Sequence, residues 1–242
     1  MFSLNYNKFD LNINIHICIY YYTTMNIVQK EKKKKKKPEL KLFYDKDLLE
    51  VGIDEAGRGC LSGRVYVGAV ILPKEIEGDM YKQIKDSKKL SKKKRNILRT
   101  YIERIALAYS VAYAEPKEID ELNILEATLQ TMHTAIDGLT IEPEQILVDG
   151  DRFHTYISPK GNFIPNELIK GGDNLYYSIA AASILAKVYH DEYVEELCEQ
   201  DPSLHEKYNW LNNMCYGTKA HMNGIKEYGI TKYHRKSFKP CR

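Results

Sequence analysis

The chain has 242 residues, of which 43% are hydrophobic and 29% are charged, as is ordinary for a globular protein with a buried core. Its net charge of +3 originates at one end. Residues 1–37 carry eight lysines and two acidic residues, whereas the rest of the chain carries 28 basic and 31 acidic residues. This balance excludes a uniformly basic body, so any affinity of that body for nucleic acid must come from local clusters of charge.

The five cysteines, at positions 18, 60, 198, 215 and 241, are odd in number and widely spaced. No pair has the spacing of a zinc site, and free thiols are typical of a reducing compartment. No segment reaches the length of a membrane span. Residues 13–22 are apolar but lack the basic stretch and the small-residue cleavage site of a signal peptide. We therefore expect a cytoplasmic, monomeric protein that does not associate with membranes.

Residues 1–41 differ in composition from the remainder, because they are rich in Asn and Tyr and contain the lysine run 32–37. A block of like charges repels itself and stays solvated, which predicts a disordered basic arm. One interpretation is an electrostatic tether for nucleic acid. The other, which we favour, is an upstream extension without a role, with Met25 as another candidate start.

From residue 42 onward the pattern alternates between strands and helices, as judged from apolar periodicity and turn residues. In chain order, the sequence predicts strands over 48–54 and 65–72, a helix over 90–106 capped by Ser91, a strand over 107–116, a long amphipathic helix over 117–139, a strand over 145–150, a long helix over 178–197 and a short helix over 218–229. This order predicts an α/β domain over 42–200 with a mixed sheet flanked by helices, followed by a C-terminal helical extension over 201–242.

Three acidic residues stand where apolar strands end: Asp54 and Glu55 after the first strand, and Asp149 after the fourth. Such a cluster repels itself unless a cation neutralises it, and all-oxygen ligation favours Mg²⁺ or Mn²⁺ and hence phosphodiester hydrolysis. Adjacent strand residues point to opposite faces, so we expect the chain to leave strand geometry at Glu55, where Ala56 and Gly57 permit a turn. The alternative is a solvated surface turn.

Two further acids are candidates. Asp173 lies in a glycine-containing loop before the last long helix, so it could reach a metal ion or could instead cap that helix. Asp191 lies inside the same helix, and we expect it to be a structural ion-pair partner.

Three segments have the composition of a nucleic-acid contact. Gly57-Arg58-Gly59 combines a cation with a backbone that can approach a phosphate or a sugar hydroxyl closely. Residues 86–95, which include Lys88, hold six cations and suit phosphate contact, although a solvated face is the default interpretation. Tyrosines stand among cations in residues 215–238, which suits stacking on a sugar or a base.

Six segments occur in the order typical of the bacterial ribonuclease HII family (type 2 ribonuclease H): GIDEAGRG, DSKKLS, LVDG, SIAAASILAKV with a following Asp, YGTKAH and KYHRKSF. The chain resembles that family from about residue 50 to residue 238. The resemblance implies a ribonuclease H-like mixed sheet flanked by helices, with a C-terminal helical extension that binds substrate. It also implies an endonuclease that hydrolyses the RNA strand of RNA–DNA hybrids and nicks 5′ of single ribonucleotides in duplex DNA, leaving a 3′-hydroxyl and a 5′-phosphate.

The resemblance assigns the catalytic residues. Asp54, Glu55 and Asp149 match the metal-binding acids of the family, and Asp173 matches its fourth catalytic acid. Two Mg²⁺ or Mn²⁺ ions, at least one recruited with the substrate, are the implied cofactors of a two-metal hydrolysis.

The resemblance also assigns the substrate-binding residues. Gly57, Arg58 and Gly59 match the loop that senses the 2′-hydroxyl at an RNA–DNA junction. Lys88 belongs to the matching DSKKLS segment, and Tyr216 matches the tyrosine that packs against the next deoxyribose.

The sequence departs from the family pattern at a few positions. Cys60 and Arg64 stand where proline is usual, His190 where arginine is usual and Cys215 where glycine is usual, and one extra glycine precedes Asp173. From these departures we expect a less rigid substrate loop in an active enzyme.

Two alternatives to this function remain. One is a carboxylate nuclease of the same fold that acts on DNA junctions. The other is a hybrid-binding protein whose altered loop has lost catalysis.

Overall fold

The computed structural model describes residues 39–242, so the arm predicted over 1–41 lies outside the described residues except for its last three positions. The strands are β1 (Glu50–Ala56), β2 (Val65–Ile71), β3 (Ala108–Ala114), β4 (Gln145–Asp149), β5 (Tyr156–Ile157), β6 (Phe163–Ile164) and β7 (Asn166–Ile169). The α-helices are α2 (Lys92–Ile105), α3 (Pro116–Leu122), α4 (Ile124–Asp137), α5 (Tyr177–Gln200), α6 (Ser203–Tyr208), α7 (Trp210–Asn213) and α8 (Lys219–Tyr228). Short 3₁₀ helices are η1 (Met80–Gln83), η2 (Ser87–Lys89), η3 (Gly172–Asn174) and η4 (Lys239–Cys241).

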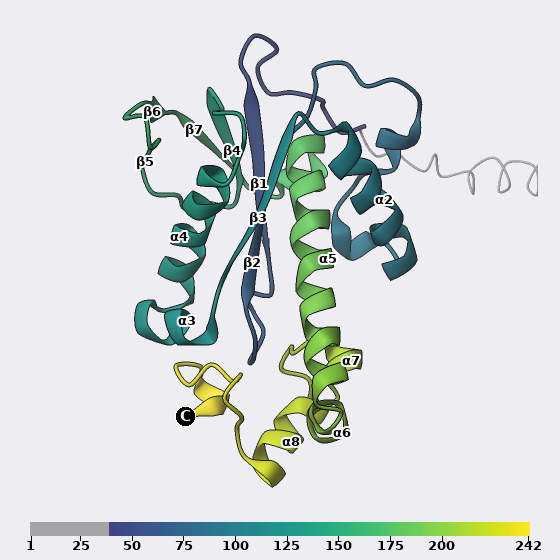
Figure 1. Cartoon of the computed structure of the whole chain (residues 1–242), viewed down its shortest axis with the longest axis vertical. Helices are drawn as coiled ribbons and strands as arrows, with labels where there is room; N and C mark the ends of the chain where they lie inside the picture. Colours follow the sequence, from purple (N-terminus) through teal and green to yellow (C-terminus); the bar gives the residue numbers. More distant parts are fainter. Residues whose placement is uncertain (1–38) are drawn as a thin grey trace, which may run out of the picture. The chain divides into compact units, whose positions relative to one another are not determined.

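A five-stranded sheet with the order β3-β2-β1-β4-β7 forms the centre of the described chain (Figure 1). β1, β2 and β3 are antiparallel neighbours, whereas β1, β4 and β7 run parallel to one another. A short loop can join antiparallel strands, but a parallel neighbour requires a longer crossover, which α3 and α4 supply between β3 and β4. The predicted α/β fold with a mixed sheet is therefore confirmed.

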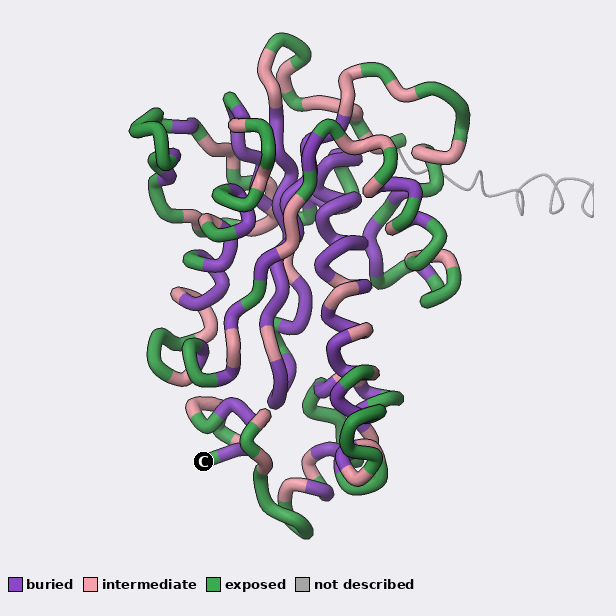
Figure 2. Tube along the Cα trace, in the orientation of Figure 1, coloured by how far each residue is buried: buried purple, intermediate pink, exposed green. Residues whose placement is uncertain are grey.

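Helices cover both faces of this sheet, with α4 on one face and α5 and α2 on the other (Figure 1). Ile53 of β1 and Val148 of β4 pack with Met132 of α4, and Leu147 of β4 packs with Ile179 of α5. Figure 2 shows the central strands as mostly buried. Strands buried on both faces have near-continuous apolar sequences, which explains why the sequence revealed them. Within residues 39–242, no helix is long and apolar enough to cross a membrane.

α5 lies directly against β1 and β2 at two glycines. A Cβ atom at Gly52 would lie 2.3 Å from the carbonyl carbon of Ser178, and one at Gly68 would lie 2.4 Å from the carbonyl oxygen of Ala182. The backbone of the helix therefore occupies the space that larger residues at these two positions would need. This contact sets where each side chain of α5 meets the sheet.

The helix predicted over 117–139 is wrong in one respect, because two helices, α3 and α4, occupy this range. Asn123 lies between them with a φ of 71°, and its side chain accepts hydrogen bonds from the amides of Leu125 and Glu126. Asn123 therefore caps α4. The apolar spacing continues across the break, so periodicity did not reveal it. The short strands β5, β6 and β7 were also not predicted.

The C-terminal helical extension packs against the end of α5 and against the loop between β1 and β2 (Figure 1). Leu61 of this loop donates its amide to the carbonyl of Cys215 (2.9 Å), and Gly63 donates to that of Tyr233 (2.8 Å). In return, the amide of Arg235 donates to the carbonyl of Leu61 (2.9 Å). The extension thus binds the loop through the backbone of both segments.

Buried histidines form the polar centre of the extension. Trp210 Nε1 can only donate, so its contact with His221 Nε2 (3.1 Å) makes that nitrogen an acceptor. His234 Nε2 lies 3.1 Å from the same atom, so it must carry the hydrogen of the neutral ring and donate it. His234 Nδ1 is then free to accept from the amide of Thr231 (2.9 Å). His221 Nδ1 donates to the carbonyl of Tyr216 (3.2 Å). These four contacts are consistent with both rings being neutral.

We predict that Gly52→Ala lowers the free energy of unfolding by about 1–3 kcal/mol, because the added methyl group forces α5 away from β1. Gly59→Ala is the matched control, since its Cβ would lie at an ordinary contact distance of 3.5 Å from the ring of Tyr216. Urea unfolding followed by circular dichroism measures both variants. Equal stabilities of the two variants would contradict the packing described above.

The histidine network also predicts a pH dependence of stability. Burial, together with the neighbouring His221, lowers the pKa of His234 to about 4, whereas an unperturbed histidine titrates near a pKa of about 6.5. Between these values the unfolded chain binds more protons than the folded chain. The contribution of His234 to stability is therefore complete above about pH 6.5 and is lost as the pH falls toward 4.

From pH 7 to pH 5, we expect the wild-type protein to lose on the order of 2 kcal/mol more unfolding free energy than His234→Gln. Urea titrations of both proteins at the two pH values measure this difference, in which all other titrating groups cancel. The same pH dependence in both proteins would show that His234 is not held neutral.

Candidate active site

Three aspartates meet near the carboxyl ends of β1 and β4. Asp54 lies near the end of β1, Asp149 ends β4 and Asp173 lies in η3. One carboxylate oxygen of each lies within 4.8 Å of the other two. Asp54 and Asp173 are buried, and Asp149 is partly buried. A set of carboxylate oxygens at this spacing suits a hard divalent cation such as Mg²⁺ or Mn²⁺.

The register of the sheet explains this meeting. β1 and β4 are parallel neighbours in which Ile53 pairs with Val148, so Asp54 and Asp149 follow at the same level. Ile53 and Val148 both pack on the α4 side, so the two aspartates that follow them point to the α5 side. Asp173 reaches the same side from η3, which directly precedes α5.

Burial opposes the negative charge of all three aspartates. It raises the pKa of Asp54 well above its usual range, and the charges of Glu55 and Asp149 add to this effect. Burial also raises the pKa of Asp149 and of Asp173, although Gly172 donates its amide to Asp149 Oδ1 (3.0 Å) and opposes the shift at Asp149. A divalent cation between these oxygens would remove the repulsion. The residues therefore fit such an ion.

Glu55 lies beside this cluster and not within it. β1 continues to Ala56, with Glu55 paired to Val67, so the expectation that the chain leaves strand geometry at Glu55 was wrong. The side chain of Glu55 forms an ion pair with Arg58 (3.3 Å), and its carboxylate is not among those that lie within 4.8 Å of one another. Burial raises the pKa of Glu55, and Arg58 opposes this rise.

The loop before α5 brings Asp173 to the cluster. The amide of Gly172 already binds Asp149, so the loop is attached to the end of β4. Tyr176 occupies the N-cap position of α5 and no side chain caps the helix, so Asp173 does not have the capping role considered as an alternative. Its carboxylate instead accepts a hydrogen bond from the side-chain amide of Asn174 (2.6 Å).

Lys88 lies in η2 and supplies a positive charge near the acids. Burial raises the pKa values of Glu55, Asp149 and Asp173, and the charge of Lys88 counteracts each of these rises. The side chain of Lys88 is exposed, so it remains accessible to a phosphate group.

Two supporting residues of the site were not predicted from the sequence. Ser183 of α5 hydrogen-bonds to Asp54 and lies 3.0 Å from the hydroxyl of Ser87. Asp86 accepts the amide of Lys88 (3.0 Å) and so holds the turn that carries this lysine. Both lie in segments that carried the family resemblance, DSKKLS and SIAAASILAKV, which is the signal that could have revealed them.

The Gly57-Arg58-Gly59 loop begins where β1 ends and contacts Tyr216. Gly57 adopts a φ of 84°, which favours glycine, whereas Arg58 and Gly59 are exposed. A Cβ atom at Gly59 would lie 3.5 Å from the ring of Tyr216, and Cys60 forms an isolated β-bridge with Tyr216. The structure therefore brings this loop and Tyr216 together, and both lie beside the end of β1.

Arg235 holds this loop from the inside of the protein. Its side chain is fully buried. Its guanidinium donates to the carbonyls of Gly57 (2.8 Å), Arg58 (3.0 Å), Gly63 (3.0 Å) and Arg64 (3.0 Å). Arg235 was not predicted to belong to the site, although it lies in the segment KYHRKSF.

The residues that depart from the family pattern make specific contacts of their own. The amide of Cys60 donates to the carbonyl of Gly57 (3.1 Å), a bond that proline cannot form. The thiol of Cys60 is buried and donates to the carbonyl of Met214 (3.2 Å). These bonds add to those of Arg235, so the loop has several attachments in place of the usual proline.

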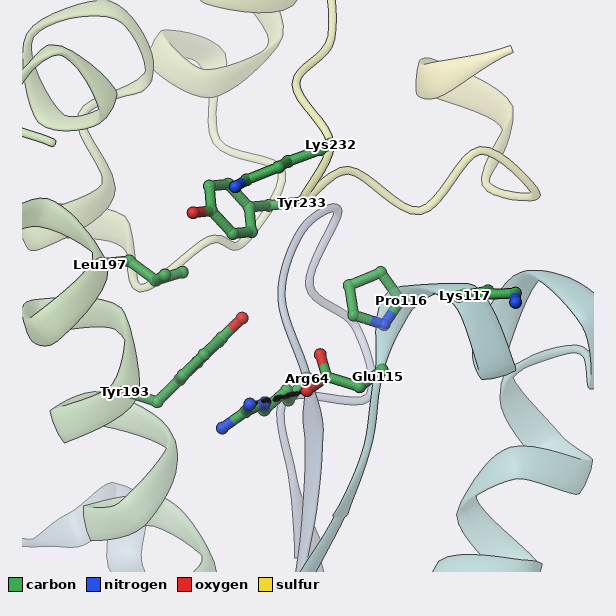
Figure 3. Close-up of a pocket in the computed structure, with 8 residues that line it drawn as sticks. All are labelled: Arg64, Glu115, Pro116, Lys117, Tyr193, Leu197, Lys232 and Tyr233. Atoms are coloured by element: carbon green, nitrogen blue, oxygen red, sulfur yellow. Dashed lines mark hydrogen bonds and ion pairs between the residues drawn. The ribbon is translucent and has the colours of Figure 1, made fainter. Parts of the chain in front are cut away.

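Arg64 lines a pocket between the sheet and the extension, as Figure 3 shows. Its guanidinium binds Glu115 (2.6 Å) and lies over the rings of Tyr113 (3.9 Å) and Tyr193 (4.3 Å). Arg64 is thus neutralised and stacked at the base of the loop and is not directed at the aspartates.

Asp191 has the structural role predicted for it. Its carboxylate forms ion pairs with Arg95 (3.0 Å) and Lys187 (2.6 Å) and lies 3.1 Å from His190 Nδ1. A Cβ atom at Gly57 would lie 2.5 Å from the ring of His190, so this histidine packs directly against the loop that follows β1.

Comparisons with known proteins agree with this fold. A sequence model of the family Ribonuclease HII matches residues 51–241. Ribonuclease HII of Christiangramia forsetii is 50% identical over 197 residues, which cover 81% of this chain and 93% of the relative. Ribonuclease HII of Bacteroides thetaiotaomicron is 47% identical over 196 residues, which cover 81% of this chain and 92% of the relative.

A solved structure shares the architecture as well. Ribonuclease H2 from Pyrococcus horikoshii OT3 superposes with a TM-score of 0.65 at 25% identity, covering 80% of this chain and 95% of that protein. The match to the family model, over residues 51–241, spans the sheet, its flanking helices and the acids at the strand ends. The chain therefore belongs to the ribonuclease HII family and is a ribonuclease H.

Proposed function

We propose that this enzyme is an endonuclease that hydrolyses the RNA strand of RNA–DNA hybrids. We propose further that it nicks duplex DNA on the 5′ side of a single embedded ribonucleotide and leaves a 3′-hydroxyl and a 5′-phosphate. The observation that carries the proposal is the cluster of three aspartates beside the loop that follows β1. A site for a phosphodiester thus adjoins a backbone segment able to recognise a sugar.

Asp54, Asp149 and Asp173 would hold Mg²⁺ or Mn²⁺, with Glu55 at the edge of the site. We propose two ions, at least one recruited with the substrate, because Mg²⁺ completes its coordination with water and phosphate oxygens. Bound ions would activate water and stabilise the leaving oxygen. The protein orients the carboxylates in advance, since the amide of Gly172 holds Asp149 and Ser183 holds Asp54.

The exposure of the proposed substrate-binding residues supports a role in reading a ribose followed by a deoxyribose. The exposed backbone of Arg58 and Gly59 can contact a 2′-hydroxyl without reading the base. Tyr216 is 36% exposed as a residue, so part of it is accessible to a neighbouring sugar. Lys88 and Arg58 add positive charge for the phosphates.

We predict that Asp54→Asn lowers the rate of nicking by at least about 100-fold, because it removes a carboxylate from the centre of the cluster. The assay uses duplex DNA with one ribonucleotide and either Mg²⁺ or Mn²⁺, and addition of a chelator should abolish the nick in wild-type protein. Asp151→Asn is the control, since Asp151 is exposed and pairs only with Lys170 (3.3 Å) in the described chain. A nick that is unaffected by Asp54→Asn would contradict the site.

The same assay separates the proposed function from its alternatives. If an all-DNA junction competes equally with the ribonucleotide-containing duplex, the enzyme is a nuclease of the same fold that acts on DNA junctions. If the protein binds a hybrid but does not cleave it in saturating Mn²⁺, it is a hybrid-binding protein without catalysis.

We predict that Tyr216→Ala lowers the preference for a single ribonucleotide over a uniform RNA–DNA hybrid by about tenfold, because stacking on a deoxyribose no longer contributes. The measurement is kcat/KM for both substrates. Tyr216→Phe keeps the ring and should keep most of the preference. A uniform loss of activity on both substrates in Tyr216→Ala would argue against a role of this ring at the junction.

A further inference from the structure

Arg235 donates four hydrogen bonds to the loop between β1 and β2. It is fully buried, and its guanidinium binds backbone carbonyls. Within residues 39–242 it forms no ion pair with a carboxylate. The segment that follows it is anchored separately, because Asp120 accepts the amides of Lys236 (2.9 Å) and Ser237 (2.8 Å). A buried charge of this kind is costly unless its donors are paired, and the four hydrogen bonds to carbonyls offset this cost in one specific geometry.

The carbonyls that Arg235 binds determine where the neighbouring amides point. Arg235 Nη2 donates a hydrogen bond to the carbonyl of Gly57, and Nη1 donates one to the carbonyl of Arg58. The described chain has no cis peptide bonds, and in a planar trans peptide the N–H points opposite to the C=O. The amides of Arg58 and Gly59 therefore point away from the guanidinium.

These two amides are available to a ligand. Neither donates to an acceptor within residues 39–242. Both residues are exposed, unlike Gly57 before them. A positive guanidinium on the carbonyl side also polarises each peptide and strengthens its N–H as a donor. Two adjacent amides held in this way form a small site for a hydroxyl or phosphate oxygen.

We propose that Arg235 is a positioning residue that orients the amides of Arg58 and Gly59 toward the sugar 2′-hydroxyl and thereby sets the preference for a ribonucleotide. The inference rests on the proposed function, since it concerns how the same loop recognises its substrate. Arg235 does not contact the substrate and acts only through the loop. A purely structural role for Arg235 would instead lower binding of every duplex equally.

The experiment measures binding of two duplexes that differ by one 2′-hydroxyl, one all-DNA and one with a single ribonucleotide, in chelator so that neither is cut. Arg235→Lys keeps the charge but cannot span the four carbonyls, and Arg235→Gln keeps two donors without the charge. We expect both variants to lose about tenfold of the preference for the ribonucleotide duplex, as two weakened hydrogen bonds imply. Affinity for the all-DNA duplex should stay unchanged.

Arg99→Lys and Arg99→Gln are matched controls. Arg99 binds Glu192 (2.6 Å) and Glu103 (2.8 Å) on the surface of α2 and α5, away from the loop, so these variants should keep the wild-type preference. If the Arg235 variants retain the preference, or lose affinity for both duplexes equally, the proposal is overturned. If the wild-type protein itself shows neither a preference nor a nick, the proposed function fails, which is a different result.

A measurement on the wild-type protein covers the case in which the Arg235 variants do not fold. Nuclear magnetic resonance spectra of ¹⁵N-labelled protein report the amides of Arg58 and Gly59 and the guanidinium of Arg235. We expect all three signals to shift with the ribonucleotide duplex and to shift much less with the all-DNA duplex. Equal shifts with both duplexes would also overturn the proposal.

Discussion

The contact of α5 with β1 and β2 is the constraint on which the site depends. At Gly52 and Gly68 the helix backbone lies so close to the sheet that a larger residue would overlap it. This position holds Ser183 against Asp54 and keeps η3, which precedes the helix, at the ends of β1 and β4. The acids are therefore brought together by packing elsewhere in the domain, because their own charges repel one another.

Apolar burial supplies the stability that this repulsion opposes. The strands carrying Asp54 and Asp149 are buried on both faces, between α4 and α5. The burial that stabilises the fold also raises the pKa of these two carboxyl groups. Their charged forms are therefore unfavourable unless a counter-charge is present. Strain of this kind is common at functional sites, where the chemistry requires groups that stability alone would exclude.

The C-terminal extension connects the loop that follows β1 to the same framework. It binds the loop after β1 through the backbone of Leu61 and Gly63 and through the buried guanidinium of Arg235. Cys60 and Arg64, where the family usually has proline, contribute their own hydrogen bonds and stacking. The loop is therefore held by tertiary contacts and does not depend on restricted backbone angles of its own.

The sequence by itself determined the family, the mixed sheet, the long helix α5 and the acids at the ends of β1 and β4, because apolar runs and strand ends are local signals. It did not reveal the break at Asn123, since the apolar spacing continues through it. The residues left two roles open for Asp173, and tertiary structure decided that it joins the cluster while Glu55 lies beside it. Tertiary structure also decided that Arg235, in a segment whose composition suits a nucleic-acid contact, is buried under the loop that follows β1. These outcomes depend on strand register and on the approach of segments more than a hundred residues apart, which no local pattern encodes.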